Sequence, residues 1–141
     1  MLENDVRTAA LGAFQYVVQR EPINSLAYLS IGTGIAAGVI LDGKLYQGSN
    51  GMAGEIGHFM IEPDGPLCNC GAYGCLEAVA AGPAYTAPAK RLLQTGQPSL
   101  LRDFDSLTAE NIYQAAQKDD PIARRIIQKS SGYLSRAIQL L

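Results

Sequence analysis

The three cysteines and the single histidine of this 141-residue chain all lie between positions 58 and 75. Their spacing is His58-x9-Cys68-x-Cys70-x4-Cys75. A closed disulfide framework needs an even number of cysteines, so three are a poor fit to one. In a reducing, cytosolic setting such clusters usually bind metal or carry chemistry. We therefore expect a cytoplasmic protein whose fold is constrained at this segment by a metal ion.

Zinc is the metal that this set of side chains favours, because three cysteines and one histidine are a common tetrahedral set for structural Zn²⁺. Cys68 and Cys70 are close enough in the chain to share one ion, and nearby glycines let the backbone turn so that Cys75 can join them. His58 is the only histidine available as a fourth ligand. Four protein ligands leave no position for a reactive water, so the predicted zinc is structural. A redox pair of thiols and inert buried thiols are the alternatives.

The charge pattern excludes several classes of protein. The net charge is −2 and no basic run is present, so nucleic-acid binding through this segment is not expected. The first residues lack the basic and apolar regions of a signal peptide. Residues 23–41 carry no charge over roughly the length of a membrane span, but "IGTGIAAG" interrupts them. Two buried strands joined by a glycine turn explain this stretch better than a membrane helix.

The N-terminal half of the chain predicts a helix followed by strands. Apolar residues at helical spacing indicate a helix over 4–20, and residues 25–31 and 34–41 are typical of buried strands. Asp42-Gly43 predicts a hairpin turn into a third strand over 44–49. Residues 50–58 are too rich in glycine for a stable helix, so we expect a loop with room for one helical turn. Residues 59–62 predict a short strand, which ends at the Pro-Asp-Gly sequence of 63–65.

The C-terminal half predicts helices. A helix should begin near Leu76, and Pro88 should interrupt or delay the next one within 83–95. Residues 94–106 resemble a loop. Thr108 is a candidate cap for a helix to about Lys118, and Asp120-Pro121 is a good start for the last helix. One face of that last helix is expected to carry Ile122, Ile126, Tyr133, Ala137 and Leu141. Because the chain begins at a helix start and ends within an apolar helix, we expect it to be part of a larger fold.

Acidic residues and a glycine turn are further candidates for binding. Glu55 and Glu77 flank the metal-ligating residues, so an ion that fixes those loops would hold both carboxylates in place; either acid alone would be an ordinary surface charge. Gly32-Thr33-Gly34 lies between two predicted strands, where exposed backbone N–H groups suit a phosphate. A plain hairpin turn is the alternative. Asp5 is either a helix cap or a general base.

Together these motifs resemble one family. The segments "END...AALG", "IGTGIAAGVILDGKLYQGSNGMAGEIGH" and "CNCGAYGCLE" are similar in order and spacing to the ROK family of sugar kinases and sugar-responsive repressors. The resemblance covers about residues 3–83. It implies an α/β chain that is part of an actin-like ATPase fold of the ribonuclease H-like, hexokinase type, with a structural zinc loop. It also implies that sugar and ATP bind in a cleft between two lobes.

The resemblance assigns a role to each matching residue. Asp5 matches the catalytic base, and Asn4 matches its sugar-binding neighbour. Glu55 and Glu77 match acids that contact sugar hydroxyls, and the zinc-bound His58 also faces the sugar. The phosphate-binding loop matches Gly32, Thr33 and Gly34. The implied reaction is transfer of the γ-phosphoryl group of ATP, with Mg²⁺, to a sugar hydroxyl that Asp5 deprotonates.

The match also has departures. Arg7 stands where family kinases commonly have a second Asn, Ala13 replaces a common Glu, and "GIAAG" replaces the commoner "GIGGG". Residues 1–141 match the central, sugar- and zinc-binding portion of a ROK domain. The first lobe and the C-terminal adenine-binding region have no counterpart in the sequence, so we do not expect this chain alone to phosphorylate a sugar.

Three functions remain open from the sequence. The favoured one is the central portion of a sugar kinase, because Asn4-Asp5, Glu55 and Glu77 are all retained. The second is the effector-binding part of a ROK-type transcriptional repressor, since some sensors keep these residues too. The third is a folded fragment that binds zinc and has no activity alone. The resemblance implies a sugar ligand, ATP and a homo-oligomer as partners.

Overall fold

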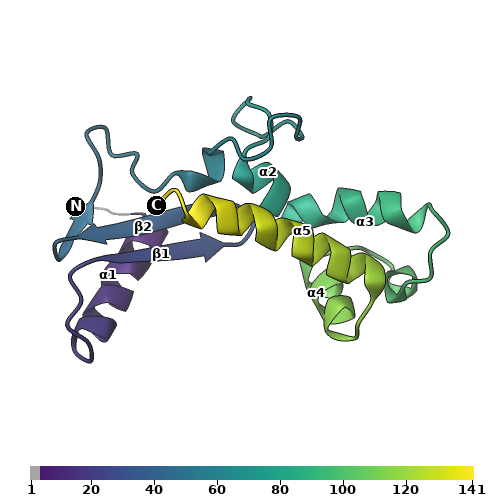
Figure 1. Ribbon diagram of the computed structural model, residues 1–141, viewed down its shortest axis with the longest axis horizontal. Helices are drawn as coiled ribbons and strands as arrows, with labels where there is room; N and C mark the ends of the chain where they lie inside the picture. The colour runs from purple at the N-terminus through teal and green to yellow at the C-terminus, as the bar shows by residue number, and fades with distance from the viewer. Residues whose placement is uncertain (1–3) are drawn as a thin grey trace.

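Figure 1 shows the computed structural model, which describes residues 4–141 of the chain. One three-stranded antiparallel sheet has the order β1 (Leu26–Ile31), β2 (Ile35–Leu41) and β3 (Lys44–Tyr46). Helix α1 (Asp5–Val18) lies on one face of this sheet, and the long helix α5 (Pro121–Ile138) crosses the other. The helices of residues 86–117 lie at the far end of α5, which gives the molecule an elongated outline (Figure 1).

Strand β2 is the centre of the first core. Ile35 and Ala37 are buried in a cluster with Tyr133 and Ala137 of α5. Because side chains alternate along a strand, Gly38 and Ile40 face the opposite side, where Gly38 lies directly against α1. The strand is therefore covered on both faces, which explains its nearly continuous apolar sequence.

A second core joins helices α3 (Thr86–Leu93), α4 (Ala109–Gln117) and the first half of α5. Its buried side chains include Leu101, Ile112 and Ile122. Helix α5 contributes to both cores, since its first half packs here and its second half packs on the sheet. The same helix therefore connects the two parts of the molecule.

Several predicted boundaries are confirmed. Asn4 caps α1 by accepting a hydrogen bond from the backbone N–H of Arg7 at 2.8 Å. Asp42 and Gly43 both have positive φ and form the two-residue turn between β2 and β3. Thr108 caps α4 in a capping box, and Asp120 caps α5, which begins at Pro121.

The region around the two prolines also follows expectation. Helix α2 (Leu76–Ala80) begins where predicted, and a 3₁₀ turn over Gly82–Tyr85 precedes α3. Pro88 lies in the first turn of α3, where backbone N–H groups have no acceptor within the helix. The late-starting helix is therefore confirmed.

Four expectations are corrected. Residues 59–62 form no strand, because Ile61 and Glu62 both donate to the carbonyl of Gly74 and only an isolated bridge joins Met60 to Cys75. The third strand ends at Tyr46, well before position 49. The expected loop 94–106 contains a 3₁₀ turn over Leu100–Asp103. Leu141 lies beyond the end of α5 and is 49% exposed, so it does not belong to the helix face.

The charge-free stretch of residues 23–41 contains two strands of the sheet, as predicted. Within residues 4–141, no helix combines the length and the apolar character that crossing a bilayer requires.

Candidate functional site

The structure brings the four predicted metal ligands together. The ligand atoms of His58, Cys68, Cys70 and Cys75 all lie within 4.8 Å of one another. The Sγ atoms of Cys70 and Cys75 are 3.6 Å apart, and Cys68 Sγ is 3.9 Å from His58 Nδ1. In a tetrahedral site with Zn–S bonds of about 2.3 Å, two sulfurs are separated by about 3.8 Å. The spacing therefore fits one tetrahedral ion, and all three cysteines are free thiols.

Backbone hydrogen bonds shape the loop that carries the cysteines. Cys68 N donates to Ala72 O at 2.8 Å, and Gly71 N donates back to Cys68 O at 2.9 Å. Gly74 has a φ of 68°, and a Cβ on it would lie 1.6 Å from the carbonyl oxygen of Glu62. Only glycine fits there, because both the backbone conformation and the space exclude a side chain.

The thiols of the cluster differ in their acidity. Burial, and after it the neighbouring thiols, raises the pKa of the Cys75 thiol to about 12. The pKa of the exposed Cys70 is lowered, chiefly by a backbone hydrogen bond from Ala72 and then by the other two thiols. Cys75 therefore keeps its proton near neutral pH unless a cation displaces it, and metal binding at this cluster releases protons.

Strand β2 gathers the remaining candidates through three close backbone approaches, each at a glycine. A Cβ on Gly38 would lie 2.4 Å from the Cβ of Ala10 and 3.0 Å from the carbonyl oxygen of Val6, in α1. A Cβ on Gly54 would lie 1.8 Å from the carbonyl oxygen of Ala37.

The third approach is at Gly57, where a Cβ would lie 2.2 Å from the carbonyl oxygen of Ile35. The start of α1, the loop before Glu55 and the turn before His58 therefore all rest directly on β2.

Glu77 is fixed at the start of the same strand. Its Oε2 accepts a hydrogen bond from the backbone N–H of Ile35 at 3.2 Å. A Cβ on Gly34 would lie 2.5 Å from this oxygen, so the glycine leaves room for the carboxylate. The structure thus brings Glu77 against the Gly32-Thr33-Gly34 turn, which the sequence did not indicate.

Glu55 stands at the head of a short 3₁₀ turn, Ile56–His58. This is the single helical turn for which the sequence left room, and it links Glu55 to the predicted metal ligand His58 through a backbone hydrogen bond of 3.1 Å. Glu55 is half-buried, and within residues 4–141 its carboxylate has no hydrogen-bond or ion-pair partner. The group is therefore available to accept hydrogen bonds from a ligand.

Asn4 and Asp5 lie at the exposed N-terminus of α1. The Asn4 side-chain oxygen is engaged in capping, and Asp5 Oδ1 accepts from the backbone N–H of Val6 at 2.9 Å. The cap of α1 is therefore Asn4, and Asp5 is the first residue of the helix, so the predicted cap role of Asp5 is wrong. Its role as a general base stays a prediction, and its second carboxylate oxygen has no partner among the described residues. Of the "END" motif, Glu3 lies outside the described residues.

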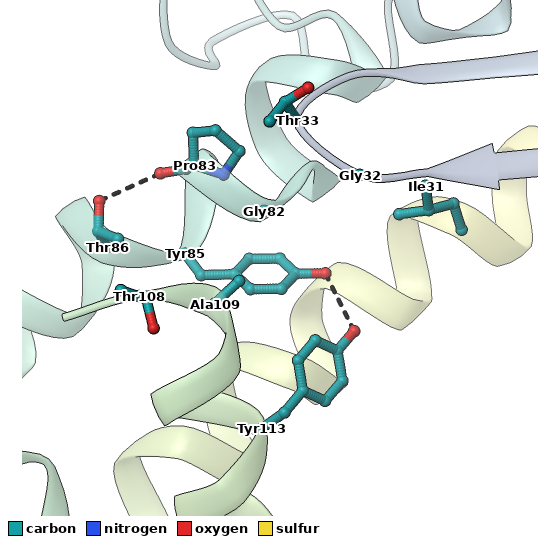
Figure 2. Close-up of a pocket in the computed structure, with 10 residues that line it drawn as sticks. All are labelled: Ile31, Gly32, Thr33, Gly82, Pro83, Tyr85, Thr86, Thr108, Ala109 and Tyr113. Atoms are coloured by element: carbon teal, nitrogen blue, oxygen red, sulfur yellow. Dashed lines mark hydrogen bonds between the residues drawn. The ribbon is translucent and has the colours of Figure 1, made fainter.

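The glycine turn is a hairpin turn between β1 and β2, with Gly32 N bonded to Gly34 O at 2.9 Å. Gly32 and Thr33 also line a cavity of about 420 Å³ together with Gly82, Tyr85 and Tyr113 (Figure 2).

In Figure 2 the hydroxyl groups of Tyr85 and Tyr113 point toward each other, 3.3 Å apart. The pKa of Tyr113 is raised to about 12, chiefly by this hydrogen bond and then by burial. Tyr113 is therefore uncharged at neutral pH in the wall of the cavity.

A larger groove of about 760 Å³ lies between α5, α3 and residues 62–66. None of the site residues predicted from the sequence lines it. The candidate site is therefore the region around β2 and the cysteine loop.

The close contacts made by four residues were not identified from the sequence: Gly38, Gly54, Gly57 and Arg7. A glycine inside a predicted strand is a known sign of close backbone approach, so Gly38 carried a usable signal. The Arg7 side chain donates to the carbonyls of Gly51 and Ala53, the latter at 3.3 Å. No local pattern indicates contacts across more than forty residues.

Curated proteins of two kinds are similar to this chain. The DNA-binding transcriptional dual regulator NagC of Escherichia coli K12 is 34% identical over 97% of the chain. A glucokinase of Halalkalibacterium halodurans is 34% identical over 98% of it. The matched segment makes up 33% and 43% of those proteins, so the chain spans less than half of their length.

The similar solved structures also include both a regulator and a kinase. A ROK family transcriptional regulator, described as a homologue of the Escherichia coli MLC protein, superposes with a TM-score of 0.87 and 38% identity, over 97% of this chain and 34% of that one. A ROK family glucokinase from Streptomyces griseus, solved with glucose and AMPPNP, superposes with a TM-score of 0.82 and 30% identity, over 98% of this chain and 46% of that one.

The similarity to a hexokinase-type ROK structure and the α/β architecture agree with the expected fold class. The model of the ROK family matches residues 1–141. The chain therefore belongs to the ROK family.

Proposed function

We propose that this segment binds the hydroxyl groups of a sugar and contributes the acceptor side of a ROK-type sugar kinase site. One observation carries the proposal. The start of α1 with Asn4 and Asp5, the turn with Glu55 and His58, and Glu77 all rest on strand β2, although they lie up to 73 positions apart in the chain.

A structural Zn²⁺ would hold two of these loops. His58, Cys68, Cys70 and Cys75 supply four ligands, so the ion would have no open position for a reactive water. His58 follows Glu55 by one turn, and Cys75 precedes Glu77 by two residues. An ion bound to both ligands would therefore fix the relative positions of the two carboxylates.

Carboxylates suit neutral sugars because an ionised carboxylate accepts hydrogen bonds from two hydroxyl groups at once. Glu55 has no partner within the described residues, and Glu77 uses one oxygen on Ile35 N. Asp5 is exposed at the helix start, where it would take the proton from the attacking hydroxyl. When bound, MgATP supplies the transferable phosphoryl group.

The glycine turn is the proposed phosphate site. Gly32 and Thr33 are exposed and border the 420 Å³ cavity, while Glu77 lies against Gly34. The proposed acceptor and donor sites would then lie on adjacent sides of one turn. The cavity beside the turn would receive the rest of the nucleotide; the similar Streptomyces griseus glucokinase was solved with AMPPNP.

A second function is favoured by a specific observation. The chain superposes on the MLC-like regulator as well as on the glucokinase, and NagC matches it at the same identity as the Halalkalibacterium halodurans enzyme. In that case the same residues form the effector site of a repressor, which needs sugar but not nucleotide. An NMR titration with AMPPNP distinguishes the two functions. Only the kinase assignment predicts that the nucleotide shifts the resonances of the Gly32 and Thr33 amides.

The sugar role of Glu77 is tested by Glu77→Gln, which keeps the shape of the side chain and removes its charge. We expect zinc content and melting temperature to stay nearly unchanged. Glucose affinity, measured by titration, should fall roughly ten- to a hundredfold, because hydrogen bonds to a charged group contribute about 1.5–3 kcal/mol.

Glu21→Gln is the matched control, since Glu21 is exposed beyond the other end of α1. Release of zinc by Glu77→Gln would mean that the residue is structural. Unchanged zinc and unchanged glucose affinity would remove it from the proposed site.

A further inference from the structure

Arg7 connects the two segments that carry the proposed sugar-binding residues. It lies two positions after Asp5 in the first turn of α1, and its backbone N–H holds the Asn4 side chain at 2.8 Å. Its guanidinium donates to the carbonyls of Gly51 and Ala53, in the loop that ends at Glu55. One residue therefore contacts both Asn4 and the loop before Glu55.

The contacted loop is irregular and rich in glycine. Residues 47–55 form no helix or strand, and Gly48, Gly51 and Gly54 all adopt positive φ. Within the loop, Ala53 N donates to Gln47 O at 3.0 Å. Two further backbone hydrogen bonds are long: Gly51 N to Gly48 O at 3.5 Å and Glu55 N to Met52 O at 3.4 Å. Met52 is 67% exposed, so the tip of the loop buries almost no apolar side chain.

The loop leaves the sheet at the end of β3 and contacts it again at Gly54. Ala37 N donates to Gly54 O at 2.7 Å, immediately before Glu55. The bonds from Arg7 fall on the preceding residues, between this anchor and β3. A charged donor that reaches two carbonyls restricts both the distance and the angle of the loop, since the guanidinium is planar and rigid.

We propose that Arg7 is a positioning residue, which holds loop 47–55 against the start of α1 and thereby sets the separation between Asn4-Asp5 and Glu55. The inference rests on the proposed function only in that this separation matters for sugar binding. The connection itself is independent of any ligand.

Hydrogen exchange tests the connection in this chain. In Arg7→Ala, the amides of Gly51, Ala53 and Glu55 should exchange roughly tenfold faster or more, because charged hydrogen bonds to the loop are lost. Arg7→Lys should restore part of the protection, since an ammonium can still reach a carbonyl. Arg20→Ala is the matched control, because the Arg20 side chain contacts Tyr16 at the other end of α1.

Two outcomes would overturn the proposal. Unchanged exchange of the loop amides in Arg7→Ala would show that the loop does not depend on Arg7. Equal acceleration of amides throughout β1 and α5 would show that Arg7 stabilises the whole fold rather than this loop.

A glucose titration of the same variants distinguishes positioning from general stability. In Arg7→Ala, glucose should still shift the NMR resonance of the Asn4 side-chain amide. The shift of the Glu55 amide resonance should be lost or much reduced. A parallel loss of both responses would overturn the positioning role. If glucose shifts neither group in the unmodified chain, the proposed function fails, whereas the exchange result still decides the role of Arg7.

Discussion

At the scale of single residues, two glycines of the cysteine loop share a backbone conformation but differ in their surroundings. Gly71 has a φ of 91° and no atom within 4 Å of the position that a Cβ would take. Gly74 has a φ of 68°, and its Cβ would overlap the carbonyl of Glu62. Alanine substitutions at these two glycines therefore separate the free-energy cost of the backbone conformation from the cost of the steric overlap.

Gly71→Ala is expected to lower the free energy of unfolding by about 1–2 kcal/mol, the usual cost of a left-handed backbone with a Cβ. Gly74→Ala should cost clearly more, because the backbone must also move away from Glu62, and its neighbour Cys75 should then lose its place in the cluster. Urea unfolding and zinc analysis measure both effects. Equal costs for the two variants would contradict the contact seen at Gly74.

Cys70 provides the complementary test of the metal. Cys70→Ser removes one of the four proposed ligands from an exposed position, so we expect a loss of stability to come from the metal rather than from packing. Since structural zinc contributes directly to folding, we expect loss of bound zinc and a destabilisation of about 4 kcal/mol or more. Asn69→Ser, in the same loop, should change neither quantity. A Cys70→Ser protein that retains one equivalent of zinc would exclude Cys70 as a ligand.

At the scale of elements, helix α5 supports the cysteine loop from the outside. The buried Tyr133 donates its hydroxyl to Glu62 Oε2 at 2.7 Å, and Glu62 in turn lies against Gly74. The helix that joins the two cores therefore also contacts the segment between His58 and Cys68.

Tyr133→Phe removes this single hydrogen bond and leaves the ring in place. The expected cost is about 1.5–3 kcal/mol, because the bond is made to a charged group that stays half-buried. Amides of residues 62–66 should exchange faster. Tyr16→Phe is the control, since Tyr16 is 61% exposed. Equal stability of the two variants would show that the bond contributes nothing.

At the scale of the whole molecule, the sequence predicted those parts that local chemistry determines. Caps at Asn4, Thr108 and Asp120 and the turn at Asp42-Gly43 are confirmed, because each depends on residues within a few positions. The cysteine and histidine cluster is confirmed for the same reason, since its ligands are close in sequence.

The convergence on β2 could not be predicted in this way. It depends on backbone contacts between residues far apart in the chain, at Gly38, Gly54 and Gly57, and a glycine alone does not show what approaches it. The strand expected at 59–62 was wrong for a related reason. Its backbone N–H groups bond to Gly74 in the cysteine loop, and no partner strand is present there among residues 4–141.

The central claim is that one sugar is bound by residues gathered on β2. The most direct test is a glucose titration of the zinc-loaded, ¹⁵N-labelled chain. We predict that three NMR resonances shift with glucose concentration along one curve with one midpoint. They are those of the Asn4 side-chain amide, the Glu55 amide and the Ile35 amide, which is hydrogen-bonded to Glu77. The absence of shifts at these positions, or shifts confined to the groove between α3 and α5, would contradict the account.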